Sequence, residues 1–199
     1  MNTQPSDSSV SPASSTHGEL PKPRSEWTTR EKLHRIGWAF VQGTFFRMSF
    51  HNWYGLRAWI LRVFGAKVGR NLRIRRSVRI EIPYNLQIGD DVIIGDQAIL
   101  YALGPITIGD RTLISQYAHL CAGSHDHRSP DYPLLKPPIN IGKDCWIAAD
   151  AFVGPGVTVG DRSVVGARAS VFKDVPPDVI AGGNPAKFIS HRQFVPQSK

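Results

Sequence analysis

The sequence predicts an all-β solenoid, a parallel β-helix of about five coils, preceded by an N-terminal helical segment. The main observation is a six-residue repeat whose leading position is aliphatic in all fifteen copies. The second is a glycine directly after the leading residue that opens every third copy. The leading residues are Val68, Ile74, Ile80, Ile88, Ile94, Leu100, Ile108, Ile114, Leu120, Ile141, Ile147, Val153, Val159, Val165 and Val171.

A strand and turn of six residues bury too little apolar surface to fold alone. Stacked coils align their leading aliphatic residues into one interior column and pair their backbones with the coils above and below. The fifth position is mostly small or β-branched, so the walls of a narrow prism can approach each other. Groups of three repeats start at 68, 88, 108, 141 and 159. The one long step, of 33 residues, predicts a coil with an inserted loop at 125–138.

Composition divides the rest of the chain. Residues 1–25 are rich in Ser, Pro and Thr and predict a disordered tail. Residues 26–66 mix aromatic and basic residues at helical spacing and predict one or two amphipathic helices, broken around 49–52. Two interpretations of this segment stay open, a cap on the solenoid or a basic element on a membrane surface. The β-helix domain is expected over 67–190, with a C-terminal tail at 191–199.

The formal charge of +8 is concentrated in the first part of the chain. Residues 1–80 hold 14 Lys/Arg and 4 Asp/Glu, whereas residues 81–199 hold 10 and 12. No nucleic-acid-binding motif accompanies this charge, so anionic lipid, acidic saccharide or a phosphate-bearing ligand is the expected partner. Residues 1–25 lack the apolar core of a signal peptide, and the two cysteines form no CxxC pair. We expect a cytoplasmic protein with reduced thiols.

Three segments are specific beyond the repeat: Gly-Ser-His-Asp (123–126), Trp-Ile-Ala-Ala (146–149) and Gly-Asn-Pro-Ala-Lys (183–187). In this order and spacing, the chain resembles the left-handed β-helix acyltransferases, which include galactoside, maltose and serine acetyltransferases. The similarity is greatest to the colanic-acid-type sugar O-acetyltransferases of exopolysaccharide biosynthesis. The resemblance implies the left hand, a homotrimer with sites between subunits, acetyl-CoA as acyl donor, a sugar hydroxyl as acceptor, and no metal.

His125 is the candidate general base. It stands where the third coil passes into the inserted loop, directly after Gly123 and Ser124, so it should be exposed on a rigid base. A neutral imidazole can take the proton of a sugar hydroxyl as its oxygen attacks a thioester. The catalytic histidine of the resembled family also falls on His125. Asp126 is expected to orient this ring or to contact the acceptor, and no role is assigned to His127.

The resemblance also implies the donor-binding residues. Trp146 is expected against the pantetheine arm and the backbone of Ala149 near the thioester, where relatives often carry Ser. Further contacts are expected from Ala167, Phe172, Lys173 and Lys187, with both lysines near the CoA phosphates. A core position for Trp146 and a solvated surface position for each lysine are the alternatives. At Gly95 the galactoside-type relatives carry an acceptor-binding Asn, so the sugar should be held differently here.

Two other functions compete. A γ-class carbonic anhydrase shares the fold and binds zinc through three histidines, of which His119 and His125 could be two. However, no histidine occurs between His51 and His119, so that set is incomplete. A non-catalytic scaffold that docks on a membrane or a partner is the third hypothesis.

Overall fold

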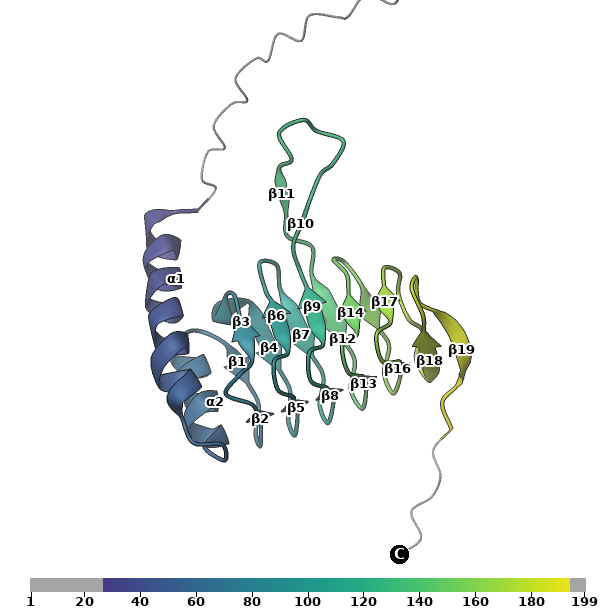
Figure 1. Cartoon of the computed structure of the whole chain (residues 1–199), viewed down its shortest axis with the longest axis horizontal. Coiled ribbons are helices and arrows are strands. Elements are labelled where there is room, and N and C mark those ends of the chain that lie inside the picture. The colour runs from purple at the N-terminus through teal and green to yellow at the C-terminus, as the bar shows by residue number, and fades with distance from the viewer. Residues whose placement is uncertain (1–26, 194–199) are drawn as a thin grey trace, which may run out of the picture.

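The structure, a computed structural model, describes residues 27–193. The predicted disordered tail at 1–25 lies outside these residues, as does 194–199 of the predicted C-terminal tail. Residues 67–182 wind into a solenoid with two short helices at its N-terminal end and a hairpin that projects from its side (Figure 1).

Each coil contributes one strand to each of three parallel sheets, so the solenoid is a three-sided prism. We name these sheets A, B and C in chain order. Sheet A contains β1 (Lys67–Val68), β4 (Leu86–Ile88), β7 (Ile106–Ile108), β12 (Ile139–Ile141) and β15 (Thr158–Val159). Sheet B contains β2 (Arg73–Ile74), β5 (Ile93–Ile94), β8 (Leu113–Ile114), β13 (Trp146–Ile147), β16 (Val164–Val165), β18 (Val179–Gly182) and β19 (Lys187–His191). Sheet C contains β3 (Arg79–Ile80), β6 (Ile99–Tyr101), β9 (His119–Cys121), β14 (Phe152–Val153) and β17 (Ser170–Val171).

The predicted parallel β-helix is confirmed, with five complete coils and a partial sixth. Fourteen of the fifteen leading aliphatic residues are buried, and Val68 is half-buried. The partial coil consists of Val175, which bridges to Val159 in sheet A, and β18, which pairs with β16. The antiparallel strand β19 then closes this edge of sheet B. The six-residue spacing does not predict this last turn, because Val175 follows Val171 by four residues instead of six.

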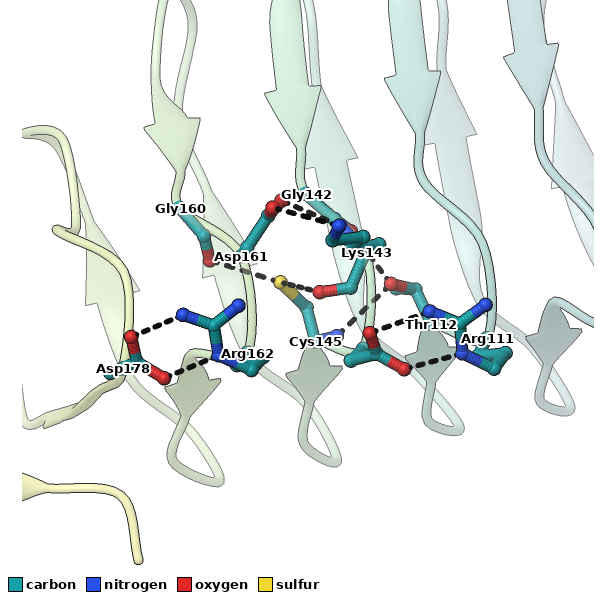
Figure 2. Close-up of polar contacts among 10 residues, drawn as sticks. Arg111, Thr112, Gly142, Lys143, Cys145, Gly160, Asp161, Arg162 and Asp178 are labelled. Atoms are coloured by element: carbon teal, nitrogen blue, oxygen red, sulfur yellow. Dashed lines mark hydrogen bonds and ion pairs between the residues drawn. The ribbon is translucent and has the colours of Figure 1, made fainter.

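The corner between sheets A and B is held by side chains that join one coil to the next. Figure 2 shows the guanidinium of Arg162 donating to the carboxylate of Asp178 at 2.6 and 2.5 Å. Two nitrogens of Arg111 donate to the carboxylate of Asp144 in the next coil, both at 2.7 Å, although the inserted loop separates the two residues in sequence. These hydrogen bonds lower the pKa values of Asp144 and Asp178. The pairs are partly exposed, so each contributes little alone, but together they fix the register of this edge.

Both cysteines are free. Cys145 is buried at this corner, where its Sγ lies 3.1 Å from the carbonyl oxygen of Gly160 (Figure 2). Burial raises the pKa values of both Cys121 and Cys145, so neither thiol is activated as a nucleophile.

The predicted helical segment is confirmed as α1 (Thr29–Val41), continued by the π-helical turn η1 (Gln42–Phe46), and α2 (Tyr54–Val63). A capping box between Thr28 and Glu31 begins α1. The indole Nε1 of Trp38 donates to the carbonyl of Ile80 at 2.7 Å, which ties α1 to the first coil. No helix within residues 27–193 is long and apolar enough to cross a bilayer.

Arg57 of α2 is fully buried, although sequence patterns place arginine at the surface. Its guanidinium donates to the carbonyls of Ile74, Phe50 and His51 and to the hydroxyl of Ser49, at 2.6–2.9 Å. These acceptors satisfy a charge that would otherwise be costly to bury. They also join the turn between the helices to coil one.

The insertion forms an antiparallel hairpin of β10 (Ser124–His125) and β11 (Leu134–Leu135), with His125 opposite Leu134. The hairpin leaves the prism after β9 of sheet C, and the chain returns at β12 of sheet A. Two coils earlier, the same corner is formed by a 3₁₀ turn, η2 (Pro83–Asn85). Strand β7 still pairs with β12 in register, Ile106 opposite Ile139, so the insertion does not disturb the stack.

We expect Gly109→Ala to lower the melting temperature by roughly 2–12 °C, from about 1–3 kcal/mol of overpacking. An added Cβ would lie 2.6 Å from the backbone carbon of Gly142 and from the backbone nitrogen of Lys143. Neither backbone atom can move without disturbing the next coil. Thermal denaturation followed by circular dichroism measures the shift.

Gly55→Ala in α2 is the matched control, because nothing lies within 4 Å of its added Cβ. It should change the free energy of unfolding by less than about 1 kcal/mol. Equal losses in both variants would contradict the close approach of the coils at Gly109.

Candidate active site

His125 lies at the base of the projecting hairpin with its side chain exposed to solvent. Its Nδ1 lies 2.5 Å from the carbonyl oxygen of Tyr132. A carbonyl can only accept, so Nδ1 must carry the proton of the neutral ring. The lone pair is then on Nε2, for which no partner is found within residues 27–193. The ring is therefore held in the tautomer that a general base requires.

Backbone hydrogen bonds hold the Tyr132 carbonyl in place. Tyr132 adopts a left-handed conformation, φ +46°, and its N–H donates to the carbonyl of Ser129 at 3.1 Å. The N–H of Asp126 donates to the carbonyl of Pro133 at 3.0 Å. Sequence reasoning missed Tyr132, because its contribution is a backbone oxygen that any residue would supply.

Asp126 is occupied with a neighbour in the hairpin. Its carboxylate accepts from Nε and Nη2 of Arg128, both at 2.9 Å, and from the Arg128 N–H at 3.0 Å. These bonds lower the pKa of Asp126. No hydrogen bond joins Asp126 to the His125 ring, which the Tyr132 carbonyl orients instead. A contact between Asp126 and the acceptor stays a prediction.

Ala149 and Ala167 occupy the same corner, between sheets B and C, in successive coils. Neither backbone N–H has an acceptor within the described chain, although Arg168 N–H donates to the Ala149 carbonyl at 2.9 Å. At the corner between sheets A and B, the corresponding N–H groups of Arg70 and Lys143 are capped by aspartates of the next coil. The residues of the next coil that would cap these two N–H groups are Ala167 and Gly183, which have no side-chain acceptor, so the donors at Ala149 and Ala167 remain available.

Trp146 points outward from sheet B and is 44% exposed, so its interpretation as a core aromatic residue is wrong. Its Nε1 donates to the hydroxyl of Ser115 in the preceding coil at 2.9 Å, which fixes the indole against the sheet. Phe172 is exposed beside Phe152, with ring centroids 5.7 Å apart. Lys173 and Lys187 are both exposed, as a phosphate ligand or a solvated charge would be.

The candidate residues lie on different sides of the prism. The hairpin with His125 leaves at the corner between sheets C and A, whereas Trp146 is on the outer face of sheet B. That corner is the edge opposite to sheet B in a three-sided prism. Ala149 and Ala167 follow sheet B directly. One chain therefore does not bring His125 together with Trp146, Ala149 and Ala167. Phe172 and Lys173 follow β17 of sheet C, at the corner from which the hairpin leaves but two coils further on.

His119 lies on the outer face of sheet C, half-buried between Tyr101 and Phe152. Burial, with a smaller effect of Arg79, lowers its pKa, and its Nε2 has no partner within residues 27–193. No three His, Cys, Asp or Glu side chains of that range lie close enough together to hold a metal ion.

The comparisons with known proteins agree with this fold. A family model described as bacterial transferase hexapeptide (six repeats) matches residues 138–173. Over 155 residues the chain is 52% identical to an Escherichia coli (strain K12) protein named as the colanic acid biosynthesis acetyltransferase WcaF, covering 78% of this chain and 85% of that protein. It is 32% identical over 136 residues to the galactoside O-acetyltransferase of the same organism, covering 67% of each.

Two solved structures are similar over most of the chain. A hexapeptide-repeat acetyltransferase from Vibrio cholerae, complexed with acetyl coenzyme A, has a TM-score of 0.76 at 27% identity, covering 84% of this chain and 91% of that one. A galactoside acetyltransferase in complex with coenzyme A has a TM-score of 0.78 at 26% identity, covering 85% and 86%.

A parallel β-helix of six-residue repeats, with these relatives, places the chain in the acyltransferase class. The chain belongs to the hexapeptide-repeat acetyltransferases. The carbonic anhydrase and scaffold hypotheses are therefore wrong.

Asp126→Asn should change turnover by less than about threefold. The substitution removes the charge that pairs with Arg128 and leaves the Tyr132 carbonyl, which sets the histidine tautomer. Steady-state rates and the NMR titration of the His125 ring measure the effect. A large loss of turnover, with the His125 titration unchanged, would assign Asp126 to the acceptor instead.

Proposed function

We propose that the protein transfers an acetyl group from acetyl-CoA to a hydroxyl of a sugar or polysaccharide precursor, with His125 as general base. The hydrogen bond from His125 Nδ1 to the Tyr132 carbonyl carries this proposal, because it leaves Nε2 free to accept a proton. Acetyl-CoA supplies the activated carbonyl carbon. As the acceptor oxygen bonds to that carbon, Nε2 takes the hydroxyl proton, the carbon–sulfur bond breaks, and the imidazolium returns the proton to the departing sulfur.

The unpaired N–H groups of Ala149 and Ala167 suit a donor that carries amide and thioester carbonyls. A backbone N–H at Ala149 can stabilise negative charge on the thioester oxygen as the acceptor adds. The exposed Trp146 and Phe172 offer apolar surface to the pantetheine arm, and Lys173 and Lys187 offer charge to the phosphates.

The acceptor class rests on the relatives, which are named for colanic acid biosynthesis and for galactoside acetylation. The structure explains why an acceptor-binding Asn is not found at Gly95. A Cβ there would lie 2.6 Å from the backbone nitrogen of Gln116 and 2.8 Å from the carbonyl carbon of Ser115. The close stacking of coils two and three thus excludes a side chain, and other residues must hold the sugar.

The outer faces of the prism support a homotrimer. The outward residues of sheet A are polar throughout: Lys67, Gln87, Thr107, Asn140 and Thr158. Sheet B presents four apolar residues after Arg73, namely Ile93, Leu113, Trp146 and Val164. Sheet C mixes apolar Ile99 and Phe152 with Arg79, His119 and Ser170. Two different faces that each expose apolar residues suit a head-to-tail contact between chains, which closes into a ring when the rotation allows it. A three-sided prism with one polar face suits a threefold ring.

Such a ring would also complete the site. Sheet B of one chain, with Trp146 and the donor N–H groups, would lie beside sheet C of its neighbour, from which the His125 hairpin leaves. The use of acetyl-CoA and the two free thiols suit a cytoplasmic protein.

His125→Ala should lower kcat by about 10²–10⁴-fold, because it removes the base while leaving the coils intact. The ring makes its one hydrogen bond within the hairpin, so the melting temperature should change little. Coenzyme A release with a sugar acceptor measures turnover, and calorimetry measures acetyl-CoA affinity. Near-normal turnover in this variant would refute the mechanism.

Trp146→Ala is the complementary variant and should weaken acetyl-CoA binding first, which calorimetry measures.

Rings assembled from two variants test whether neighbouring chains share the site. The assay uses acetyl-CoA at a concentration too low for either variant alone to turn over. If the base and the tryptophan come from neighbouring chains, co-assembled His125→Ala and Trp146→Ala chains then recover about a quarter of wild-type activity. Roughly three quarters of randomly assembled rings are mixed, and each mixed ring holds one intact site of three. Light scattering should give three chain masses for both variants. No recovery from mixed trimers would place the whole site within one chain.

A further inference from the structure

The helices at the N-terminal end expose an extended apolar surface on the side that does not pack on the solenoid. We call this surface the cap face. Its members are Phe45, Met48, Trp53, Leu56, Trp59 and Val63, each between 37% and 77% exposed. They line a groove of about 570 Å³ that runs along η1 and α2, together with Val41 and Ile60. A contiguous apolar surface of this kind marks an interaction site.

The cap face is distinct from the surface that holds the helices to the solenoid. Trp38, Phe46 and Leu61 are fully buried and join the continuous hydrophobic core. A helix needs one apolar side to pack on a domain. Helix α2 has two, since Leu61 faces the core while Trp59 and Val63 remain exposed. The second apolar side is thus not explained by the fold.

Basic side chains surround the cap face. Arg47 and Arg76 line a hollow together with Met48, and Arg30 lines another with Val63 and Phe64. No ion pair to any of these three arginines is present among residues 27–193. Residues 27–80 contain 12 Lys/Arg and a single Asp/Glu, Glu31.

The charge is concentrated in the coil that contacts the helices. Coil one presents a basic residue outward from each of its three strands, Lys67, Arg73 and Arg79. The residues that pair with them in coil two are Gln87, Ile93 and Ile99, none of which is charged. The basic surface is therefore a property of the capped end and not of the whole prism.

We infer that the cap face docks the protein peripherally on a membrane that contains anionic lipid. Aromatic and aliphatic side chains surrounded by arginines match the two parts of such a surface, the acyl boundary and the anionic headgroups. A second copy is a poor occupant, because a symmetric contact would bring the two basic rims together. Residues 1–26 are poor occupants also, since Met1, Val10 and Leu20 are their main large apolar residues. This inference rests on the cap alone and not on the proposed chemistry.

The test is co-sedimentation of the full chain with vesicles of phosphatidylcholine alone or mixed equally with phosphatidylglycerol. We expect binding to the mixed vesicles, at least tenfold weaker binding to the neutral ones, and loss of binding as salt is raised. The emission of Trp53 and Trp59 should shift to shorter wavelength on binding. No binding to either vesicle, or equal binding to both, would overturn the inference.

Variants of exposed residues locate the contact without disturbing the core. Met48→Gln with Trp59→Gln should reduce binding at least tenfold, and Arg47→Gln with Arg76→Gln should reduce both the binding and its salt dependence. Phe188→Gln with Ile189→Gln on β19 is the matched control, because these residues are 59% and 62% exposed at the other end of the solenoid. Unchanged melting temperatures confirm folding. Vesicle binding that persists in the cap-face variants would overturn the inference. So would a wild-type oligomer larger than a trimer that the cap-face variants dissociate.

Discussion

Coil-on-coil stacking is the constraint on which every other feature depends. Each leading aliphatic residue lies above its counterpart in the coil below, so its position in the six-residue repeat determines what a side chain faces. This is why a hairpin can leave after β9 and the chain can resume at β12 in unbroken register. The hairpin inherits a rigid base from the pairing on both sides. His125 is exposed for that reason without being loosely held.

The candidate site consists of what the stack leaves unsatisfied. Buried backbone groups in the sheets are paired by the neighbouring coil, and the corner between sheets A and B is closed by aspartates and arginines. The corner after sheet B has no such side chain at Ala167 or Gly183, so the N–H groups of Ala149 and Ala167 have no acceptor within residues 27–193.

The six-residue repeat made the strand positions, the inward residues and the inserted loop predictable from sequence, and the helical spacing of residues 26–66 made the break between the helices predictable. The resemblance supplied the hand and the candidate residues. The Tyr132 carbonyl could not be predicted, because a backbone acceptor has no side-chain signature. Nor could the burial of Arg57, which depends on backbone and hydroxyl acceptors that the turn before α2 and the strand β2 bring around its guanidinium. The residue before the leading aliphatic carries one further signal: it is polar in all five coils of sheet A and apolar in four of the five coils of sheet B.

The proposed trimer and the proposed membrane surface reinforce each other through symmetry. A threefold rotation leaves directions along its axis unchanged. The helical caps of all three chains therefore lie at the same end of the ring. Three cap faces would then meet one flat surface together. Once one cap binds, the other two are held at high effective concentration, and individually weak contacts give firm attachment. The polar sheet A, which needs neither a neighbour nor lipid, would face solvent around the ring. The division of apolar, basic and polar residues among the faces and ends of the prism thus follows from one arrangement.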